Sequence, residues 1–312
     1  MSEEFVAGVD AGGTKTVALI CAANDADHVP IGKGVAGPGN IRAVGAEFAF
    51  EQIERAITLA IAGASASCDQ IKKMCIGGAG AGRAEEQELI SRWARHNYSG
   101  CQVQVITDAE ILLAAVEGHT NGVALICGTG SLAWGRNHEG REHRCGGWGY
   151  RIGDEGSAYA IAIAGLTAAA RAVDGRGPQT TLLKRLLSRF PSADTGRSLD
   201  AASNLLSLVY GENASREDLA RLADCIFECA AEADDAATSI LATAASQLAQ
   251  MIRLTAQRLE LPTGFPLAIG GGVVIHQHDF RRMILDQLAD LQPRVTVVAE
   301  PAMGALCLAA RG

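Results

Sequence analysis

The chain has 312 residues, of which 48% are hydrophobic and 20% are charged, and its formal net charge is −8. This length favours two domains, because single hydrophobic cores rarely grow beyond about 250–300 residues. The negative charge, with no basic stripe along the sequence, argues against a nucleic-acid-binding protein.

Secretion and membrane insertion are not indicated either. The first four residues, Met-Ser-Glu-Glu, are acidic, unlike the start of a signal peptide, and the apolar segment 158–170 is short and built of small residues. Nine cysteines are scattered without a CxxC pair, which is typical of reduced residues in a cytosolic protein. We therefore expect a cytoplasmic protein without a membrane or nucleic-acid partner.

The first motif is a glycine turn between two predicted strands. Apolar residues 5–9 and 17–20 flank Asp10-Ala11-Gly12-Gly13-Thr14-Lys15-Thr16. Such a turn leaves N–H groups and hydroxyls free for a phosphate, and the Asp10 carboxylate suits a hydrated cation. An ordinary Gly-Gly hairpin explains the same residues, so the motif alone leaves both interpretations open.

Strands and helices alternate after this turn. A strand over 31–36 ends in a Gly-Pro-Gly loop with Asn40 at its tip, where Asn40 is either a turn residue or a ligand contact. Helical periodicity covers about 46–63, and strands are predicted over 73–76 and 102–106. This alternation predicts a mixed α/β sheet with ligands at strand ends.

Two of these strand ends carry candidate functional residues. The strand over 73–76 runs into Gly77-Gly78-Ala79-Gly80-Ala81-Gly82, a composition expected where the backbone passes close to another group. The strand over 102–106 delivers Asp108 to a predicted helix over 109–116. From the residues alone, Asp108 either caps that helix or orients and deprotonates an acceptor hydroxyl.

The pattern restarts at Gly122. Residues 123–127 predict a strand, Gly128-Thr129-Gly130-Ser131 a turn, and 132–134 a returning strand. This order repeats the opening of the chain and indicates a duplicated domain. Two such loops can hold one polyphosphate from both sides.

A glycine-rich block follows over 145–158, Cys-Gly-Gly-Trp-Gly-Tyr-Arg-Ile-Gly-Asp-Glu-Gly-Ser-Ala. Trp148 lies among glycines, so it either plugs a gap between domains or lines a pocket. Asp154 precedes a helix predicted over about 155–172 and is a suitable N-cap for it.

The remainder of the chain is predicted to be helical before it returns to strands. Helices are expected over about 180–262. A strand over 266–269 runs into Gly270-Gly271-Gly272, a last strand covers 295–298, and residues 300–305 open a terminal helix.

Together these motifs resemble the acetate kinase/sugar kinase/Hsp70/actin superfamily, and within it the N-acetylglucosamine kinase branch of the BadF/BadG/BcrA/BcrD ATPase family. The matching segments span almost the whole chain, and the block over 145–158 is the specific one. They are residues 10–16, 77–80, 107–109, 128–131, 145–158, 270–272 and 304–305.

The resemblance implies an α/β protein with two duplicated ribonuclease H-like (actin-like ATPase) domains and an active-site cleft between them. The expected domains are a small one over 1–118 and a large one over 119–301. The terminal helix, about 302–312, is expected to pack back on the small domain.

The resemblance also implies roles for individual residues. ATP would bind to Asp10, Gly12, Gly13, Thr14, Lys15, Thr129, Gly130, Gly271 and Gly272. The sugar would bind to Asn40, Gly78, Asp108, Gly147, Trp148, Gly149 and Asp154. Asp108 would be the general base, and Asp10 would hold Mg2+ through water.

The implied activity is an ATP-dependent amino-sugar kinase that forms N-acetyl-D-glucosamine 6-phosphate, in a homodimer with ATP and Mg2+. Glucosamine and N-acetylmuramic acid are alternative substrates. A dehydratase-activating ATPase and a non-catalytic sugar sensor are more distant alternatives. Ile41-Arg42 and Tyr150-Arg151-Ile152 depart from the animal enzymes near the sugar, so the substrate follows less directly than the fold.

Overall fold

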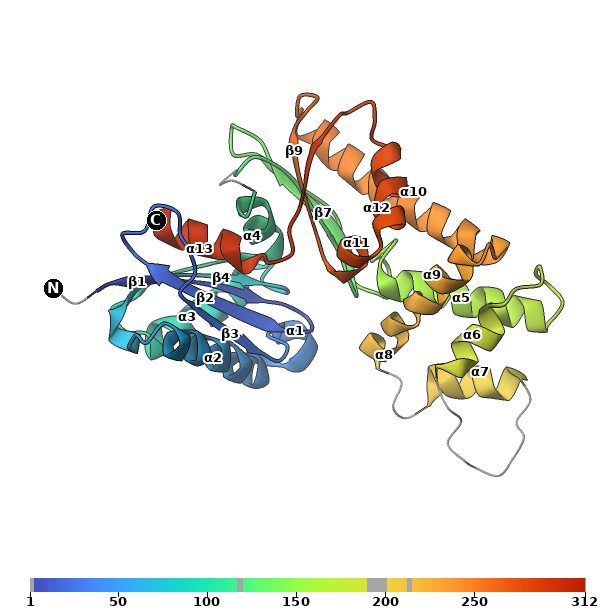
Figure 1. Ribbon diagram of the computed structural model, residues 1–312, viewed down its shortest axis with the longest axis horizontal. Coiled ribbons are helices and arrows are strands. Elements are labelled where there is room, and N and C mark those ends of the chain that lie inside the picture. The colour runs from blue at the N-terminus through green and yellow to red at the C-terminus, as the bar shows by residue number, and fades with distance from the viewer. Residues whose placement is uncertain (1–2, 117–119, 190–200, 212–214, 312) are drawn as a thin grey trace.

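The computed structural model describes residues 3–116, 120–189, 201–211 and 215–311 (Figure 1). It contains two five-stranded sheets, with strand orders β3-β2-β1-β4-β5 and β10-β9-β6-β7-β8. The predicted domain boundary at 118/119 lies outside the described residues.

The first sheet combines a three-stranded meander with two parallel strands. β1 pairs antiparallel with β2 and parallel with β4, while β2 pairs antiparallel with β3 and β4 parallel with β5. The strands are β1 (Phe5–Ala11), β2 (Thr16–Ala22), β3 (Gly32–Ala36), β4 (Ile71–Gly78) and β5 (Gln102–Thr107).

The two faces of this sheet are covered by different helices, because alternate strand residues point to opposite faces. Phe5, Ala7 and Val9 pack in one cluster with residues of α2 and α3, whereas Val6 packs in another with residues of α4 and α13. The helices are α1 (Ile41–Val44), α2 (Ala46–Gly63), α3 (Ala84–Asn97), α4 (Asp108–Ala114) and α13 (Ala302–Arg311), with a short 3-10 turn at Cys68–Gln70.

The second sheet repeats the first in order and direction. Its central strand β6 is antiparallel to β7 and parallel to β9, with β8 and β10 outside them. The predicted duplication is therefore confirmed. The strands are β6 (Gly122–Cys127), β7 (Ser131–Arg136), β8 (Glu142–Gly146), β9 (Pro266–Gly270) and β10 (Arg294–Val297).

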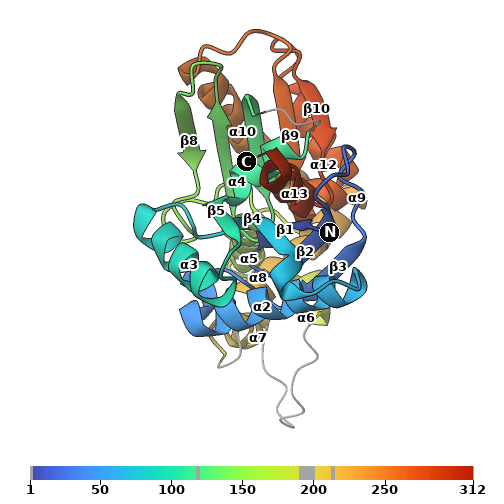
Figure 2. The same cartoon turned by 90° about the vertical axis from the view of Figure 1, so that its left-hand side faces the viewer.

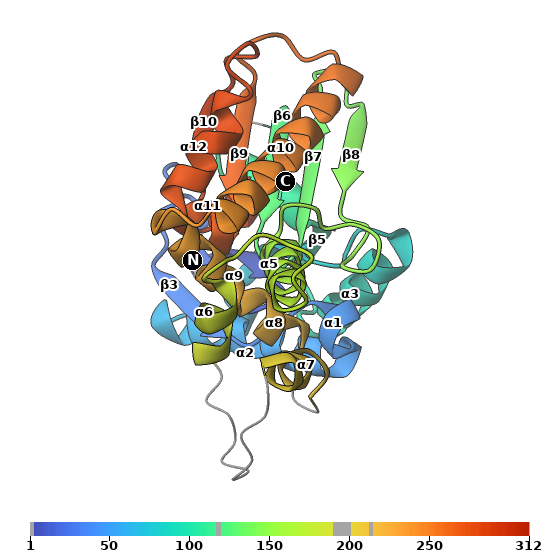
Figure 3. The same ribbon diagram turned by 90° about the vertical axis from the view of Figure 1, so that its right-hand side faces the viewer.

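Helices surround the second sheet and extend beyond it. Figure 3 shows α10 running across one face of the sheet, where its Leu248 and Ile252 are fully buried. The helices are α5 (Ala158–Val173), α6 (Leu182–Ser188), α7 (Ala201–Tyr210), α8 (Arg216–Arg221), α9 (Ala223–Ala231), α10 (Asp235–Arg258), α11 (Gly272–His276) and α12 (His278–Asp286). No helix in the described ranges is long and apolar enough to span a membrane.

One helix, α4, contacts both sheets, and the terminal helix packs beside it on the first. The terminal helix α13 packs on β1, β4 and α4 (Figures 1 and 2). Leu112 and Leu113 of α4 form an apolar cluster with Ala124, Trp134 and Ala268 of the second sheet. Asp108, the first residue of α4, is thus carried by an element that contacts both sheets.

Candidate active site

The first glycine loop is a hairpin whose tip is open. The N–H of Gly12 donates to the carbonyl of Lys15 at 3.0 Å, and the N–H of Gly39 donates to the carbonyl of Gly12 at 3.0 Å. Gly13, Thr14 and Lys15 are exposed, and a Cβ placed on Gly13 would meet nothing within 4 Å. The loop therefore rests on the Gly39 loop and leaves its tip free for a ligand.

Asp10 and Asp108 are partly buried carboxylates that repel one another. Burial raises the pKa of Asp10 to about 7, and the negative charges of Asp108 and Glu300 add to this, while Lys15 opposes it. Burial raises the pKa of Asp108 to about 6, against the Ala109 N–H and the Arg144 charge. A cation beside Asp10 would relieve this repulsion.

The donor set fits a hydrated Mg2+. The described ranges hold no group of three or more His, Cys, Asp or Glu side chains placed to enclose a metal. Mg2+ commonly keeps several waters and takes one or two carboxylates plus substrate phosphates. Asp10, beside an open loop suited to phosphate, matches that requirement.

The helix-capping role considered for Asp108 belongs to Thr107. The Thr107 hydroxyl accepts from the N–H of Glu110, and the Glu110 carboxylate accepts from the N–H of Thr107, which is a complete capping box. Asp108 Oδ1 accepts from the adjacent N–H of Ala109, at 3.0 Å. The carboxylate of Asp108 is therefore not required to cap α4.

The second glycine loop meets the end of β9. The N–H of Gly128 donates to the carbonyl of Gly130 at 2.9 Å, and a Cβ on Gly128 would lie 3.6 Å from the nitrogen of Gly272. Gly271 has φ +98° and presses against the backbone of Cys127, so only glycine fits there. The structure thus brings Thr129, Gly130, Gly271 and Gly272 to one edge of the second sheet.

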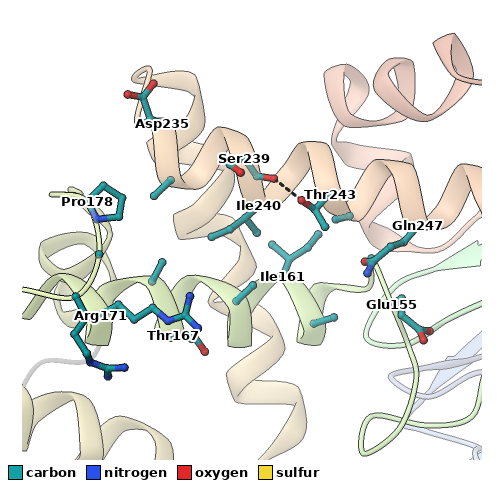
Figure 4. Close-up of a pocket in the computed structure, with 18 of the residues that line it drawn as sticks. Glu155, Ile161, Thr167, Arg171, Pro178, Asp235, Ser239, Ile240, Thr243 and Gln247 are labelled. Carbon is teal, nitrogen blue, oxygen red and sulfur yellow. Dashed lines mark hydrogen bonds between the residues drawn. The ribbon is translucent and has the colours of Figure 1, made fainter. Parts of the chain in front are cut away.

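The glycine loop around Trp148 does not bury that side chain. Gly147 and Gly149 adopt φ +70° and +86°, which reverses the backbone on either side of Trp148. Trp148 is 74% exposed, so it does not plug a gap between domains, and its role in lining a pocket stays a prediction. A cavity of about 680 Å³ between α5 and α10 reaches Gly153 and Glu155 but is not lined by Trp148 (Figure 4).

Asp154 is not the N-cap of the following helix. Ser157 takes that role by accepting from the N–H of Ala160, and the helix begins at Ala158. Asp154 is 4% exposed with φ +61°, and its Oδ2 accepts from Arg216 at 2.8 Å. Burial raises the pKa of Asp154, while Arg216 lowers it.

Asn40 lies where two loops beside the first sheet meet. Its side chain accepts from the N–H of Arg42 at 3.0 Å and caps α1, so the turn role is confirmed. A Cβ on Gly80 would lie 2.5 Å from Asn40 Oδ1. Asn40 is therefore next to the glycine run that begins at Gly77-Gly78.

Two arginines at the site were missed by the sequence reasoning. Arg144 donates to the carbonyls of Gly146 and Gly147, and its Nη1 would lie 3.5 Å from a Cβ on Gly82 in the other half of the chain. Its position next to the 145–158 block was the available signal. Arg216 lies in the predicted helical region 180–262, where no motif marked it as a site residue.

This fold and this arrangement of loops define a two-domain protein of the actin-like ATPase class, with candidate phosphate loops on both central strands. The chain belongs to the BadF/BadG/BcrA/BcrD ATPase family, whose sequence profile matches residues 7–309.

Relatives with names for their activity cover nearly the whole chain. The chain is 29% identical over 311 residues to the N-acetylmuramic acid/N-acetylglucosamine kinase of Clostridium acetobutylicum, covering 98% of each protein. It is also 29% identical to the N-acetyl-D-glucosamine kinase of Dictyostelium discoideum, covering 99% of this chain and 98% of that one.

Solved structures show the same fold. A provisionally named N-acetylglucosamine kinase from Chromobacterium violaceum matches with a TM-score of 0.76 at 21% identity, over 99% of both chains. The ROK hexokinase of Thermus thermophilus matches with a TM-score of 0.53 at 16% identity, over 98% of this chain and 97% of that one.

Proposed function

We propose that the protein is an ATP-dependent kinase that converts N-acetyl-D-glucosamine and ATP to N-acetyl-D-glucosamine 6-phosphate and ADP. The observation that carries this proposal is the pair of glycine loops on duplicated sheets, with Asp108 at the start of α4, a helix that contacts both sheets. The names of relatives that match nearly the whole chain support the same activity.

The nucleotide would be held by both loops. Gly12, Gly13, Thr14 and Lys15 would contact the β- and γ-phosphates from one domain, and Thr129 and Gly130 from the other. The adenosine would lie against Gly271 and Gly272. Asp10 would hold Mg2+ through water, and the cation would neutralise charge on the transferring phosphoryl group.

The sugar would lie between Asp108, the base for its 6-hydroxyl, and the glycine-rich block over 145–158. Asn40, Gly78, Gly147, Trp148, Gly149 and Asp154 would bind it. Asp108 would accept the proton of the sugar 6-hydroxyl. The oxygen of that hydroxyl would then form a bond to the γ-phosphorus, while the bond between the γ-phosphorus and the ADP oxygen breaks. Phosphoryl transfer needs mainly positioning and charge neutralisation, which these groups can supply.

The test is release of ADP with a panel of N-acetylglucosamine, N-acetylmuramic acid and glucosamine. Asp108→Ala should still bind ATP but lose sugar phosphorylation, and Asp108→Asn should lose about 10²-fold or more in kcat. Unchanged turnover in these variants would reject the mechanism.

N-acetylmuramic acid is the second candidate substrate. It is favoured by the name of the Clostridium relative, which includes both sugars, and Ile41-Arg42 depart from the animal pattern at the edge of the Asn40 loop. A higher kcat/KM for N-acetylmuramic acid than for N-acetylglucosamine in the panel would select it.

We further propose a cytoplasmic homodimer. The nine cysteines are all free thiols, which suits a reducing compartment. Sedimentation equilibrium tests the assembly, and a monomer at micromolar concentration would contradict it.

A further inference from the structure

Arg216 contacts three parts of the candidate site from outside every recognised motif. It is the first residue of the short helix α8, which Ser215 caps. Its Nη2 donates to Asp154 Oδ2 at 2.8 Å, and its guanidinium carbon lies 5.3 Å from the centre of the Tyr150 ring. A Cβ on Gly130 would lie only 2.9 Å from the same Nη2.

The ion pair therefore lies directly against the second phosphate loop. Asp154 Oδ2 would be 3.0 Å from that hypothetical Cβ of Gly130, and Asp154 Oδ1 is 3.5 Å from the N–H of Ser131. The Asp154 side chain is only 6% exposed and that of Arg216 is 30% exposed. Arg216 thus joins the glycine block over 145–158 to the loop over 128–131.

Asp154 depends on this partner for its charge. A carboxylate this buried is costly to ionise unless it is paired and hydrogen-bonded. Burial and the nearby Glu155 charge raise the pKa of Asp154, and Arg216 is the positive charge that opposes them, with help from the N–H groups of Ser131 and Gly149. Without Arg216, Asp154 would be a neutral acid over more of the working pH range.

The guanidinium is also held in one plane. Among the residues that the structure describes, none accepts from the buried Nε of Arg216, and the contacts that orient the guanidinium are the ion pair and the Tyr150 ring. Tyr150 packs edge-on against Tyr159 of α5. Only a planar cation makes both contacts at once, which Lys cannot reproduce.

We infer that Arg216 is a positioning residue for amino-sugar binding, which keeps the Asp154 carboxylate ionised and aimed beside the second phosphate loop. This inference rests on the proposed function, in which Asp154 accepts a hydrogen bond from the sugar. Part of the sugar affinity would then depend on α8, a helix that packs on α5 and α9.

The test is direct calorimetric titration of N-acetylglucosamine and N-acetylmuramic acid into the wild type, Arg216→Ala and Arg216→Lys. Removing one partner of a buried charge pair is expected to weaken sugar binding about 10- to 100-fold in Arg216→Ala, with partial recovery in Arg216→Lys. ATP affinity should change less than sugar affinity, because Asp154 is assigned to the sugar, although Arg216 also lies against Gly130 of the phosphate loop. Arg221→Ala is the matched control, since Arg221 closes the same helix, is exposed and pairs with Asp218.

Two further measurements separate positioning from a purely structural role. Asp154→Asn should reproduce the loss, and adding Arg216→Ala to it should cost little more, because Arg216 acts through Asp154. The ratio of variant to wild-type Kd for Arg216→Ala should fall as pH rises, because burial raises the pKa of Asp154 and the unpaired carboxyl ionises only at higher pH than in the wild type. Asp10 and Asp108 titrate in both proteins and largely cancel from the ratio.

An Arg216→Ala variant with a lower Tm but unchanged sugar Kd would overturn the inference, as would additive losses in the double variant. A wild type that phosphorylates no amino sugar would reject the proposed function. A wild type that is active, with Arg216→Ala binding sugar equally well, would reject only the role of Arg216.

Discussion

At the scale of single residues, Asp108 sets the expected pH dependence. A general base must be ionised, and the pKa of Asp108 is raised to about 6. We expect kcat/KM for the sugar to fall about tenfold per pH unit below pH 6 and to level off above it. ADP release between pH 4.5 and 8 measures this, and an acid limb near pH 4 would show that Asp108 has an ordinary pKa.

Asp10 is expected to cost stability when it ionises. Its folded pKa is about 7, against 3.8 for an unperturbed aspartate, so the native state binds more protons between these values. The stability from this group is present below about pH 4 and is lost as pH rises through 7.

We therefore expect Asp10→Asn to raise Tm at pH 8 in the absence of Mg2+, by about 2–4 °C for each kcal/mol relieved. The gain should vanish near pH 4, and the variant should lose kinase activity. Calorimetric scans at both pH values test this. Asp279→Asn is the control, because the side chain of Asp279 is 89% exposed and already pairs with Arg282; an equal gain in it would contradict the explanation.

Some site residues could be predicted from sequence and others could not, for physical reasons. Gly271, with its positive φ, and Gly12, whose added Cβ would lie 2.8 Å from the carbonyl oxygen of Lys15, stand out because few residues other than glycine tolerate such a turn or close approach. Asp108 and Asp154 were candidate caps from sequence, whereas Thr107 caps α4 and Ser157 caps α5, because Asp, Ser and Thr all make suitable caps. Arg216 could not be identified, since its ion pair with Asp154 joins residues 62 positions apart.

At the scale of elements, α13 depends on two glycines that let it lie against backbone. A Cβ on Gly8 in β1 would collide with the backbone of Leu306 and lie 2.8 Å from the carbonyl oxygen of Ala302. A Cβ on Gly304 would collide with the carbonyl oxygen of Ile111 in α4. The terminal helix is therefore packed against both β1 and α4 with no space for a methyl group.

Gly8→Ala is expected to destabilise the protein by about 1–3 kcal/mol, because backbone atoms cannot move aside as side chains do. Chemical denaturation followed by circular dichroism measures the loss. Gly63→Ala is the control: its added Cβ would be 3.5 Å from its nearest neighbours, and its helical position makes it neutral or slightly stabilising. A Gly8→Ala variant as stable as Gly63→Ala would contradict the packing.

Element boundaries followed the sequence where periodicity or turns were strong. The helix predicted over 46–63 coincides with α2 because Ile53 and Ile57 lie one turn apart and are both buried. The helix predicted from 155 begins instead at Ala158. Asp154 holds a positive φ in its ion pair with Arg216, and the chain turns again at Gly156 before the helix can start.

At the scale of the whole molecule, the duplication was predictable and the joining of the two halves was not. Repeated strand-turn-strand patterns at residues 5–20 and 122–134 indicated two like sheets, and both sheets have the same strand order. The contact between them depends on the apolar face of α4, where Leu112 would touch a Cβ placed on Gly270. The apolar periodicity of α4 predicts that one face is buried, but it does not identify the strands of the second sheet that cover that face.

The contact of the two sheets through α4 also predicts that the two domains close around the substrates. The candidate phosphate loops belong to different sheets, so one ATP held by both must draw them together. Trp148 and Ile152 are 74% and 76% exposed without ligands, and closure over a sugar would remove this apolar surface from water. We expect the radius of gyration to fall only when ATP and sugar are both bound.

Small-angle X-ray scattering of Asp108→Asn with Mg2+, ATP and N-acetylglucosamine measures closure, because this variant should hold both substrates without rapid turnover. A blue shift of tryptophan emission should accompany closure and be lost when Trp148→Phe is added, since burial of the indole in an apolar setting causes it. Either substrate alone should produce a smaller change. An unchanged scattering curve, with both ligands shown to be bound by calorimetry, would mean that the loops already stand at the distance one ATP requires.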